Sequence, residues 1–473
     1  MATVRDFQVN NGLEVNLDAN VVGTSTALDF YGGTAAPTVA PSVVFDFARS
    51  VKLDSRLSFN RPTTATYRAA NGMVVTANND TPRFQYNSNG SCMGVLVERG
   101  STNDALYSTN IGNTNYYVLQ EGVAGSVGMT LNTGQAPDGS NTATYLFHAT
   151  NTNTYKSIFN GIGIVTNRPY AHSVWVKANN QPTMGVSHYD GGDNMNTISI
   201  LYTFATNTFS TSTNGSANCA IIGSPSVEPY KDGWYRMSYT YHYTGGPSSR
   251  FIQLKYNLDT LTLTPGSGLF YWGAQHEWND KPTSFIYTTT GAATRAYEYL
   301  YCVDDARGNN LTSWLNTNRG TVSVEWSVPL TGPTSFVGYS AYPGPFVFWK
   351  SEGDGGNVLA HIYYADAGAT KPIGLEGFVN NTYLYSTSQG NVANGVTYKT
   401  AAGFDYPANN FVLSTNGGVP GGGGMTNGAN VPITARLDLG RSRANWLDGT
   451  VKTFRYWPIK LSNTDIQYST LPA

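Results

Sequence analysis

Two short segments combine an aromatic side chain with polar side chains, which is the combination that sugar binding needs. An aromatic ring stacks on the apolar face of a sugar, and a few polar groups fix its orientation. The segments are residues 188–194 (HYDGGDN) and 349–354 (WKSEGD). The alternative is that these rings belong to cores or interfaces, as most rings do in a chain with 13% aromatic residues. The candidate carbohydrate-binding residues are Tyr189, Asp190, Asp193, Asn194, Trp349 and Asp354.

The first segment also has the chemistry of a calcium site. Asp190 and Asp193 carry carboxylate oxygens, the ligands that Ca²⁺ prefers, and are the candidate ligands. We expect no other cofactor, because the three cysteines are far apart and none of the six histidines pairs at the i,i+4 spacing of a zinc site.

The sequence lacks the motifs of common hydrolytic and nucleotide-dependent sites. It has no HExxH, no GxSxG and no P-loop Gly-Lys-Ser/Thr. Glycoside hydrolysis needs two carboxylates that flank the scissile bond, whereas Glu325 stands alone beside Trp326. We therefore expect a protein that is no enzyme, with a glycan-depolymerising enzyme as the less favoured alternative.

The composition is that of an extracellular or virion protein. Only 12% of the residues are charged, against about 25% in an average soluble domain, so the surface must be polar but uncharged. The net charge of −2 gives no attraction to nucleic acid or to an anionic membrane surface. Because no run of 18 apolar residues occurs, we expect no membrane insertion.

Period-two alternation predicts the strands that must position these residues. Residues 321–328 place Val and Trp on one face and Thr, Ser and Glu on the other, which indicates a strand with one buried face. Residues 234–243 and 433–439 alternate in the same way. We expect short helical turns near residues 311–316 and 463–469. Many short strands with frequent turn residues indicate antiparallel β-sandwiches.

The chain is too long for one hydrophobic core, and changes in composition divide it into four parts. Residues 1–42 contain an Ala/Thr/Pro/Val-rich stretch and are predicted to be an extended N-terminal arm with its linker. Residues 43–108 are predicted to form a small β unit. Residues 109–297 and 298–473 are predicted to form one antiparallel sandwich each. The expected fold class is therefore all-β.

The first of these β parts resembles a module of phage structural and tail proteins. Residues 59–67 (FNRPTTATY), 82–86 (PRFQY) and 95–98 (VLVE) follow one another in the order of that module. The family usually has Leu after Asn103, where this chain has Asp104. This departure concerns the local packing around residue 104 and not the assignment to the module.

The second part resembles a carbohydrate-binding-module-type jelly roll found in phage proteins. Two residues depart from the pattern, because His276 and Tyr287 stand where Leu and Pro are usual. The resemblance implies a jelly-roll sandwich fold. Its motifs are residues 171–178 (AHSVWVKA), 232–236 (DGWYR), 271–277 (YWGAQHE) and 282–286 (PTSFI).

The third part resembles a concanavalin A-like (laminin-G-type) sandwich. A strand and hairpin turn are expected at residues 409–418, and further strands lead to the closing turn at residues 461–462. The motifs that carry this resemblance are residues 437–440 (LDLG), 447–451 (LDGTV) and 454–458 (FRYWP).

The ordered motifs imply a structural component of a bacteriophage virion, such as a tail fibre or another surface appendage. Residues 1–42 would anchor it to other virion proteins, and the sandwiches would contribute to host attachment through a cell-surface glycan. The first residues (MATVRD) have no apolar core, so we expect no signal peptide and a virion location after synthesis in the host cytoplasm. We expect a homotrimer, as in many fibres. The alternative is a capsid- or neck-decorating protein without a glycan ligand.

Overall fold

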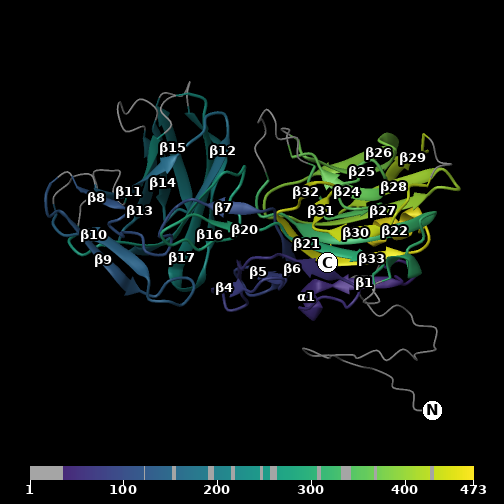
Figure 1. The fold of residues 1–473 in the computed structure, drawn as a ribbon, viewed down its shortest axis with the longest axis horizontal. Coiled ribbons are helices and arrows are strands. Elements are labelled where there is room, and N and C mark those ends of the chain that lie inside the picture. The colour runs from purple at the N-terminus through teal and green to yellow at the C-terminus, as the bar shows by residue number, and fades with distance from the viewer. Residues whose placement is uncertain are drawn as a thin grey trace, which may run out of the picture.

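The computed structural model is all-β, as the sequence predicts (Figure 1). Two short α-helices occur in the described residues, α1 (Phe47–Ser50) and α2 (Asn463–Tyr468), and neither has the length or hydropathy of a membrane span. Residues 1–35 of the predicted arm lie outside the described residues. The structure describes residues 36–121, 123–151, 156–189, 197–214, 219–245, 249–255, 264–305, 310–331, 342–366, 370–426 and 431–472.

One sandwich, here called the terminal sandwich, takes strands from both ends of the described chain. Its first sheet has the order β29-β28-β27-β22-β33-β6-β5 with β1 beside β33, and its second has the order β2-β21-β30-β23-β24-β25-β26. The first sheet comprises β1 (Val43–Asp46), β5 (Arg83–Tyr86), β6 (Cys92–Val97), β22 (Arg319–Ser327), β27 (Thr397–Asp405), β28 (Asn410–Thr415), β29 (Gly421–Gly423) and β33 (Gly449–Trp457). The second comprises β2 (Ser58–Asn60), β21 (Tyr299–Val303), β23 (Phe346–Trp349), β24 (Val358–Tyr364), β25 (Pro372–Val379), β26 (Thr382–Asn391) and β30 (Arg436–Leu439).

The other sandwich, here called the middle sandwich, has two six-stranded antiparallel sheets. Their orders are β16-β17-β12-β19-β10-β9 and β15-β14-β13-β18-β11-β8. The first sheet comprises β9 (Val127–Gly134), β10 (Ala143–His148), β12 (Pro169–Asn179), β16 (Cys219–Pro229), β17 (Trp234–Tyr243) and β19 (Gly268–Glu277). The second comprises β8 (Val118–Glu121), β11 (Lys156–Gly163), β13 (Thr183–Tyr189), β14 (Thr197–Thr203), β15 (Thr208–Asn214) and β18 (Ser249–Lys255).

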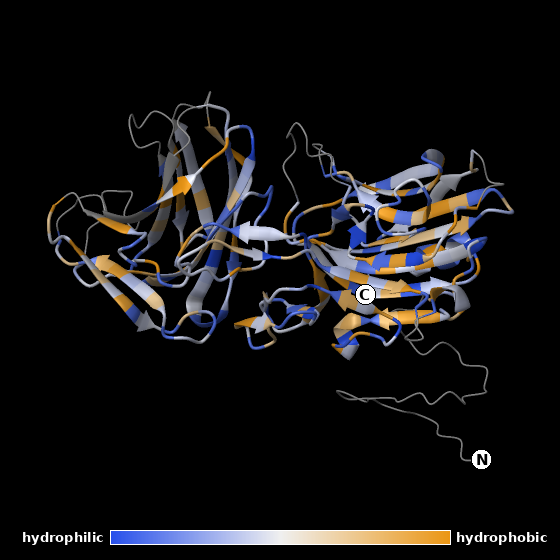
Figure 2. Cartoon of the chain, viewed as in Figure 1, coloured by the Kyte–Doolittle hydropathy of each residue, from blue (hydrophilic) through white to orange (hydrophobic). Residues whose placement is uncertain are grey.

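Hydrophobic residues follow the strands of both sandwiches, and each sandwich encloses its own core (Figure 2). On β17 the predicted face with Met237, Tyr239 and Tyr241 lies in the core of the middle sandwich. The strand predicted at residues 433–439 is shorter than expected, because β30 begins at Arg436 and Ile433 is exposed. The predicted helical turns are confirmed as α2 and as the 3-10 turn η2 (Leu311–Ser313).

The predicted single buried face of β22 is wrong, because both faces are covered. The Val and Trp face lies in the core between the two sheets. On the polar face, the Thr321 hydroxyl donates to the carbonyl of Ile459 at 3.0 Å, and the Ser323 hydroxyl donates to the carbonyl of Ser469 at 3.1 Å. The chain that follows β33, including α2, therefore shields the outer side of this sheet and satisfies its hydroxyl groups.

The residues predicted as a small β unit share sheets with the C-terminal part of the chain. β6 pairs with β33 and β2 pairs with β21, so residues 43–108 contribute to both sheets of the terminal sandwich. Figure 1 shows these N-terminal strands beside the C-terminal ones. The boundaries at residues 108 and 297 stay predictions. The other strands form pairs: β3 (Ala65–Arg68) with β4 (Val74–Ala77), β7 (Ser101–Asn103) with β20 (Ala293–Arg295), and β31 (Arg441–Ser442) with β32 (Asn445–Trp446).

The last residues of the predicted arm are fixed to the terminal sandwich. The backbone N–H of Thr38 donates to Oδ1 of Asp465 at 2.8 Å. The indole N–H of Trp457 donates to the carbonyl of Val39, also at 2.8 Å. The chain is thus held against α2 and β33 before β1 begins.

Candidate functional site

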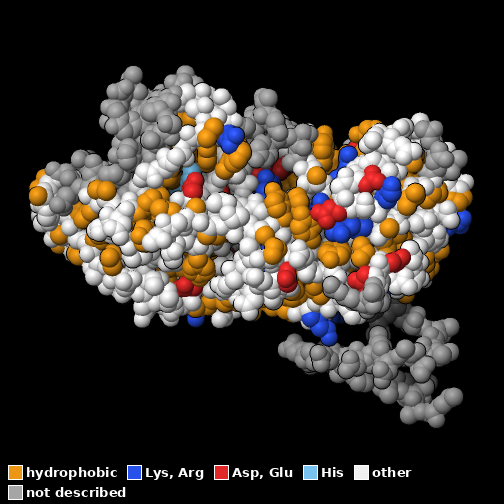
Figure 3. Space-filling view, viewed as in Figure 1, with side chains coloured by type: hydrophobic (Ala, Val, Ile, Leu, Met, Phe, Trp, Pro, Cys, Tyr) orange, Lys and Arg blue, Asp and Glu red, His pale blue; other side chains and the backbone are white. Residues whose placement is uncertain are grey.

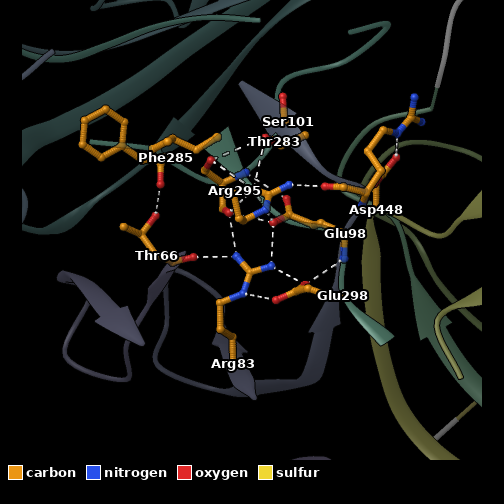
Figure 4. A network of polar contacts seen from close by, with 12 residues as sticks. Thr66, Arg83, Glu98, Ser101, Thr283, Phe285, Arg295, Glu298 and Asp448 are labelled. Carbon is orange, nitrogen blue, oxygen red and sulfur yellow. Dashed lines mark hydrogen bonds and ion pairs between the residues drawn. The ribbon is translucent and has the colours of Figure 1, made fainter. Parts of the chain in front are cut away.

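A buried group of charged side chains joins the two sandwiches (Figure 4). Nη2 of Arg83 lies 2.7 Å from Oε2 of Glu98, and its Nε donates to Oε1 of Glu298 at 2.9 Å. Arg295 lies 3.0 Å from Glu98, and Arg61 lies 2.7 Å from Glu298. All five residues are buried. We call this group the Arg–Glu joint.

The motifs that carry the family resemblance supply this joint. Arg61, Arg83 and Glu98 come from the first module, and Ser284 comes from the last motif of the second. The Ser284 hydroxyl donates to Oε2 of Glu98 at 2.6 Å. Burial alone would raise the pKa of Glu98, but the positive charges of Arg295 and Arg83 lower it to about 2, so the carboxylate stays ionised. These motif residues hold the sandwiches together and leave no face for a ligand.

A second set of ion pairs crosses the same boundary. Nε of Arg99 lies 2.6 Å from Oδ2 of Asp448 in the terminal sandwich, and its Nη1 lies 2.9 Å from Oδ1 of Asp280. Nζ of Lys281, which follows the middle sandwich in sequence, lies 3.3 Å from Oδ2 of Asp366 and 3.7 Å from Oδ2 of Asp448. The two sandwiches are therefore linked by several buried or half-buried charges.

A cleft of about 550 Å³ lies beside this joint. It borders the two-stranded ribbon of β7 and β20, in which Thr102 pairs with Thr294. Strand alternation exposes Thr102 and buries its neighbours Ser101 and Asn103. The hydroxyl oxygens of Thr102 and Thr294 lie 2.7 Å apart. The ribbon thus presents a hydroxyl pair to the cleft.

Aromatic rings from both sides of the joint line the cleft. Trp278, directly after β19, is 50% exposed, and Tyr297, between β20 and β21, is 47% exposed. The Tyr297 ring lies 4.4 Å from the ring of Trp446, whose indole N–H donates to the carbonyl of Glu298 at 2.6 Å. Figure 3 shows hydrophobic side chains gathered where the sandwiches meet. Exposed rings beside polar groups meet the requirement for sugar stacking.

Asp104 brings a carboxylate to the same cleft, with 40% of its side chain exposed. Its Oδ1 lies 2.5 Å from Nδ1 of His276, and Nε2 of His276 lies 2.6 Å from the hydroxyl of Tyr241. The backbone N–H of Asp104 also donates to the carbonyl of His276, at 3.0 Å. Asp104 and His276 are two of the residues at which the chain departs from the family it resembles, and here they contact each other.

Two acid–histidine–hydroxyl chains in the described part of the structure end in inaccessible hydroxyls. The chain from Asp104 ends at Tyr241, which is fully buried and whose pKa burial raises well above 10. In the terminal sandwich, Nδ1 of His361 lies 2.6 Å from Oγ of Ser442, and Nε2 lies 3.4 Å from Oε2 of Glu376. Ser442 is also fully buried. Neither hydroxyl can reach a substrate as a nucleophile.

The structure places Trp349 and Asp354 beside a second hollow, of about 580 Å³, which shares the tip of the β31–β32 hairpin with the cleft. Trp349 is not the exposed stacking ring that the sequence suggested. It ends β23, is 1% exposed, and donates its indole N–H to Oδ2 of Asp438 at 2.6 Å. Packing against the neighbouring strands covers its ring, whereas Tyr342 is the exposed ring at this hollow.

The other predicted segment cannot be placed in the same way. Tyr189 ends β13, but its side chain lies outside the described residues, as do Asp190, Asp193 and Asn194. The sugar and calcium sites at this segment therefore stay predictions. Among the residues that the structure describes, no group of three or more His, Cys, Asp or Glu side chains is placed to hold a metal ion.

Comparisons with known proteins give distant likenesses to solved structures. No family model matches the chain, and no curated protein matches it by sequence. The CBM40 domain of the Ruminococcus gnavus IT-sialidase, solved with alpha2,3 sialyllactose, is 16% identical with a TM-score of 0.27, over 36% of this chain and 89% of that domain.

Two further solved structures show the same distant likeness. The SAP-like pentraxin from Limulus polyphemus is 14% identical with a TM-score of 0.23, over 32% of this chain and 68% of its own. The Trypanosoma rangeli sialidase, solved with sialic acid, is 10% identical with a TM-score of 0.27, over 69% of this chain and 60% of its own. Likenesses of this size assign neither a ligand nor an activity to this chain.

Proposed function

We propose that this chain is a glycan-binding attachment protein of a bacteriophage particle, and that it binds its ligand without transforming it. The observation that carries the proposal is the cleft at the joint, where Trp278 and Tyr297 expose rings beside the Thr102–Thr294 hydroxyl pair. A sugar ring stacked on one of these rings would place its hydroxyls against that pair and against Asp104.

The geometry beside the cleft supports binding over catalysis. Both acid–histidine–hydroxyl chains end in the buried hydroxyls of Tyr241 and Ser442. Glu98, Glu298 and Asp448 are committed to ion pairs with arginines. Glycoside hydrolysis needs a free acid and a free base or nucleophile on the two sides of the sugar, and these carboxylates do not supply them.

The virion part of the proposal rests on the ordered motifs and on the composition. The chain would be held to other virion proteins through its N-terminal arm, would act as a homotrimer and would reach the outside as part of the particle. A structural virion component without a glycan ligand, such as a capsid- or neck-decorating protein, is the second candidate. The Arg–Glu joint favours this second candidate, because a rigid link between two sandwiches suits a structural component of a particle.

A glycan array with the full chain tests the binding proposal. We expect the wild-type protein to bind a set of host-type glycans and Trp278→Ala to weaken that binding about tenfold or more, because the stacking surface is lost. Tyr383→Ala is the matched control, since Tyr383 is equally exposed but does not line the cleft. Incubation with host polysaccharide should release no reducing ends.

Three outcomes would contradict the proposal. Absence of binding to every glycan would reject the glycan-binding function. Equal binding by the wild-type protein and Trp278→Ala would move the site away from the cleft. Release of reducing ends that exceeds the buffer background would reject the claim that the protein is no enzyme.

A further inference from the structure

We infer that Asp104 determines which sugars the cleft accepts, and that the cleft selects neutral, hydroxyl-rich sugars over sugars that carry a carboxylate. This inference rests on the proposed function, because it assigns the ligand class of the same cleft. It follows from three features of the described residues: how Asp104 is held, what its carboxylate can bind, and how the other charges at the cleft are compensated.

Asp104 is held in place by groups that are themselves buried. His276 is fully buried, and its ring stacks on Tyr170 with the centroids 5.0 Å apart and the planes at 8°. The backbone N–H of His276 donates to Oδ1 of Asn103 at 3.0 Å. Both ring nitrogens are satisfied when Nδ1–H donates to Asp104 and Nε2 accepts the hydroxyl proton of Tyr241. The carboxylate is thereby preorganised, which lowers the entropic cost of binding.

The carboxylate suits the hydroxyls of a sugar. An ionised carboxylate only accepts hydrogen bonds, and its two oxygens can accept from two adjacent hydroxyl groups. His276 takes up part of the capacity of Oδ1, and the side chain is 40% exposed toward the solvent. Such charge-assisted bonds are about twice as strong as bonds between neutral groups. With Trp278 lining the same cleft, the arrangement fits a sugar that offers one apolar ring face and free hydroxyls.

The remaining charges that line the cleft are compensated. Arg99 is paired with both Asp448 and Asp280. Arg295 is paired with Glu98 and is 1% exposed. Among the charged residues that line the cleft, Asp104 is therefore the one whose charge is exposed. A sugar carboxylate brought into this cleft would meet a like charge at short range, which is unfavourable in a site partly shielded from water.

One cation, Arg168, lies near the cleft and must be part of the test. The guanidinium carbon of Arg168 lies 3.7 Å from the centroid of the Trp278 ring. Arg168 does not line the cleft, and it covers part of the ring by a cation–π contact. We therefore expect Arg168 to support the orientation of Trp278 and not to attract an acidic ligand.

Binding of neutral and acidic glycans by charge variants tests the inference. The probes are neutral galactose- and glucose-type oligosaccharides and the same oligosaccharides capped with sialic acid or a uronic acid. We expect Asp104→Asn to weaken binding of the neutral probes about tenfold and to reduce the discrimination against the acidic ones. Asp232→Asn is the matched control, because it removes a carboxylate whose side chain is 53% exposed and which does not line the cleft.

Two further variants keep the test decisive. Asp104→Leu with His276→Leu replaces the whole pair by apolar side chains, and we expect it to lose the neutral-sugar preference. We also expect a lower melting temperature, because the buried hydroxyl of Tyr241 loses its partner His276. Arg168→Gln should leave the neutral-to-acidic ratio unchanged. If Arg168→Gln abolishes binding of acidic probes that the wild-type protein prefers, the inference is wrong.

The outcomes separate this inference from the proposed function. Binding that depends on Trp278 but prefers acidic sugars, or that is unaffected by Asp104→Asn, overturns the role of Asp104 and leaves the glycan-binding function intact. Absence of binding to both classes of probe overturns the proposed function and this inference with it. Binding that is indifferent to Trp278→Ala moves the site away from the cleft and overturns this inference, while glycan binding itself stands.

Discussion

Glu298 shows what a buried charge requires of its surroundings in this molecule. Its carboxylate accepts hydrogen bonds from Arg61 and from Arg83, and the backbone N–H of Glu98 donates to its Oε2 at 2.9 Å. Taking such a group out of water costs several kcal/mol, and close, well-aligned partners must offset that cost. The joint therefore contributes a defined geometry between the sandwiches more than it contributes net stability.

Glu298→Gln should strongly destabilise the protein. The substitution keeps the size of the side chain but leaves Arg61 and Arg83 facing an uncharged amide whose N–H groups cannot accept their bonds. Breaking a buried ion pair at one partner costs about 3–5 kcal/mol, and we expect a loss of that size in the free energy of unfolding from denaturant titration. Glu228→Gln, at the exposed partner of Arg68, should cost less than about 1 kcal/mol. Equal losses from the two substitutions would contradict the claim that the buried ion pairs of Glu298 cost more to break than the pair of the exposed Glu228.

At the scale of strands, alternation identified the elements but not their surroundings. The spacing of residues 234–243 and 321–328 predicted β17 and β22 correctly, because side-chain period is a local property. Burial of their polar faces was not predictable, since the covering segments come from elsewhere in the chain. Arg236 on β17, for example, donates to the carbonyl of Thr283 at 2.7 Å.

The candidate cleft could not be predicted from the sequence either, because the segments that form it are distant from one another in the chain. Its lining comes from four stretches, residues 99–104, 278–279, 294–297 and 444–446, which only the fold brings together. A signal was nevertheless present in two of the three positions at which the chain departs from the patterns it resembles. At two positions where the resemblance implies Leu, this chain has Asp104 and His276, and the structure brings these two side chains into contact.

Buried histidines on the two facing sheets of the middle sandwich predict that acid destabilises it. Burial lowers the pKa of His172 on β12 to about 3, with a further contribution from the charges of His276 and Arg236. It lowers the pKa of His188 on β13 well below 6.5. The unfolded chain binds these protons near pH 6.5 and the folded chain does not, so stability is present above pH 6.5 and is lost as the pH falls toward 3.

We expect His172 alone to remove about 2 kcal/mol from the free energy of unfolding between pH 7.5 and pH 5. His172→Leu, which cannot titrate, should make this dependence shallower, as measured by denaturant unfolding at a series of pH values. The ionised Glu98, with its pKa lowered to about 2, adds a loss only below about pH 4.5, so the two effects separate along the pH axis. An identical pH slope in the wild-type protein and His172→Leu would contradict the burial of a neutral histidine.

At the scale of the whole molecule, both ends of the described chain close the terminal sandwich. β1 pairs with β33, and residues 38–39 bond to Asp465 and Trp457 before β1 begins. The joint then fixes the middle sandwich to this closed unit. A protein held in this way presents its cleft at a constant position relative to residues 38–39.

Removal of residues 1–35 tests the anchoring role without disturbing the sandwich. The truncated chain keeps the bonds of Thr38 and Val39, so we expect an unchanged melting temperature and unchanged glycan binding, with loss of incorporation into particles when it is supplied in place of the full chain during infection. A truncation of residues 1–41 is the matched control for the boundary. It removes those bonds as well, and we expect a lower melting temperature because Asp465 and Trp457 lose partners. Normal incorporation of the chain that lacks residues 1–35 would show that the arm is not the anchor, and would shift the attachment surface to the sandwiches themselves.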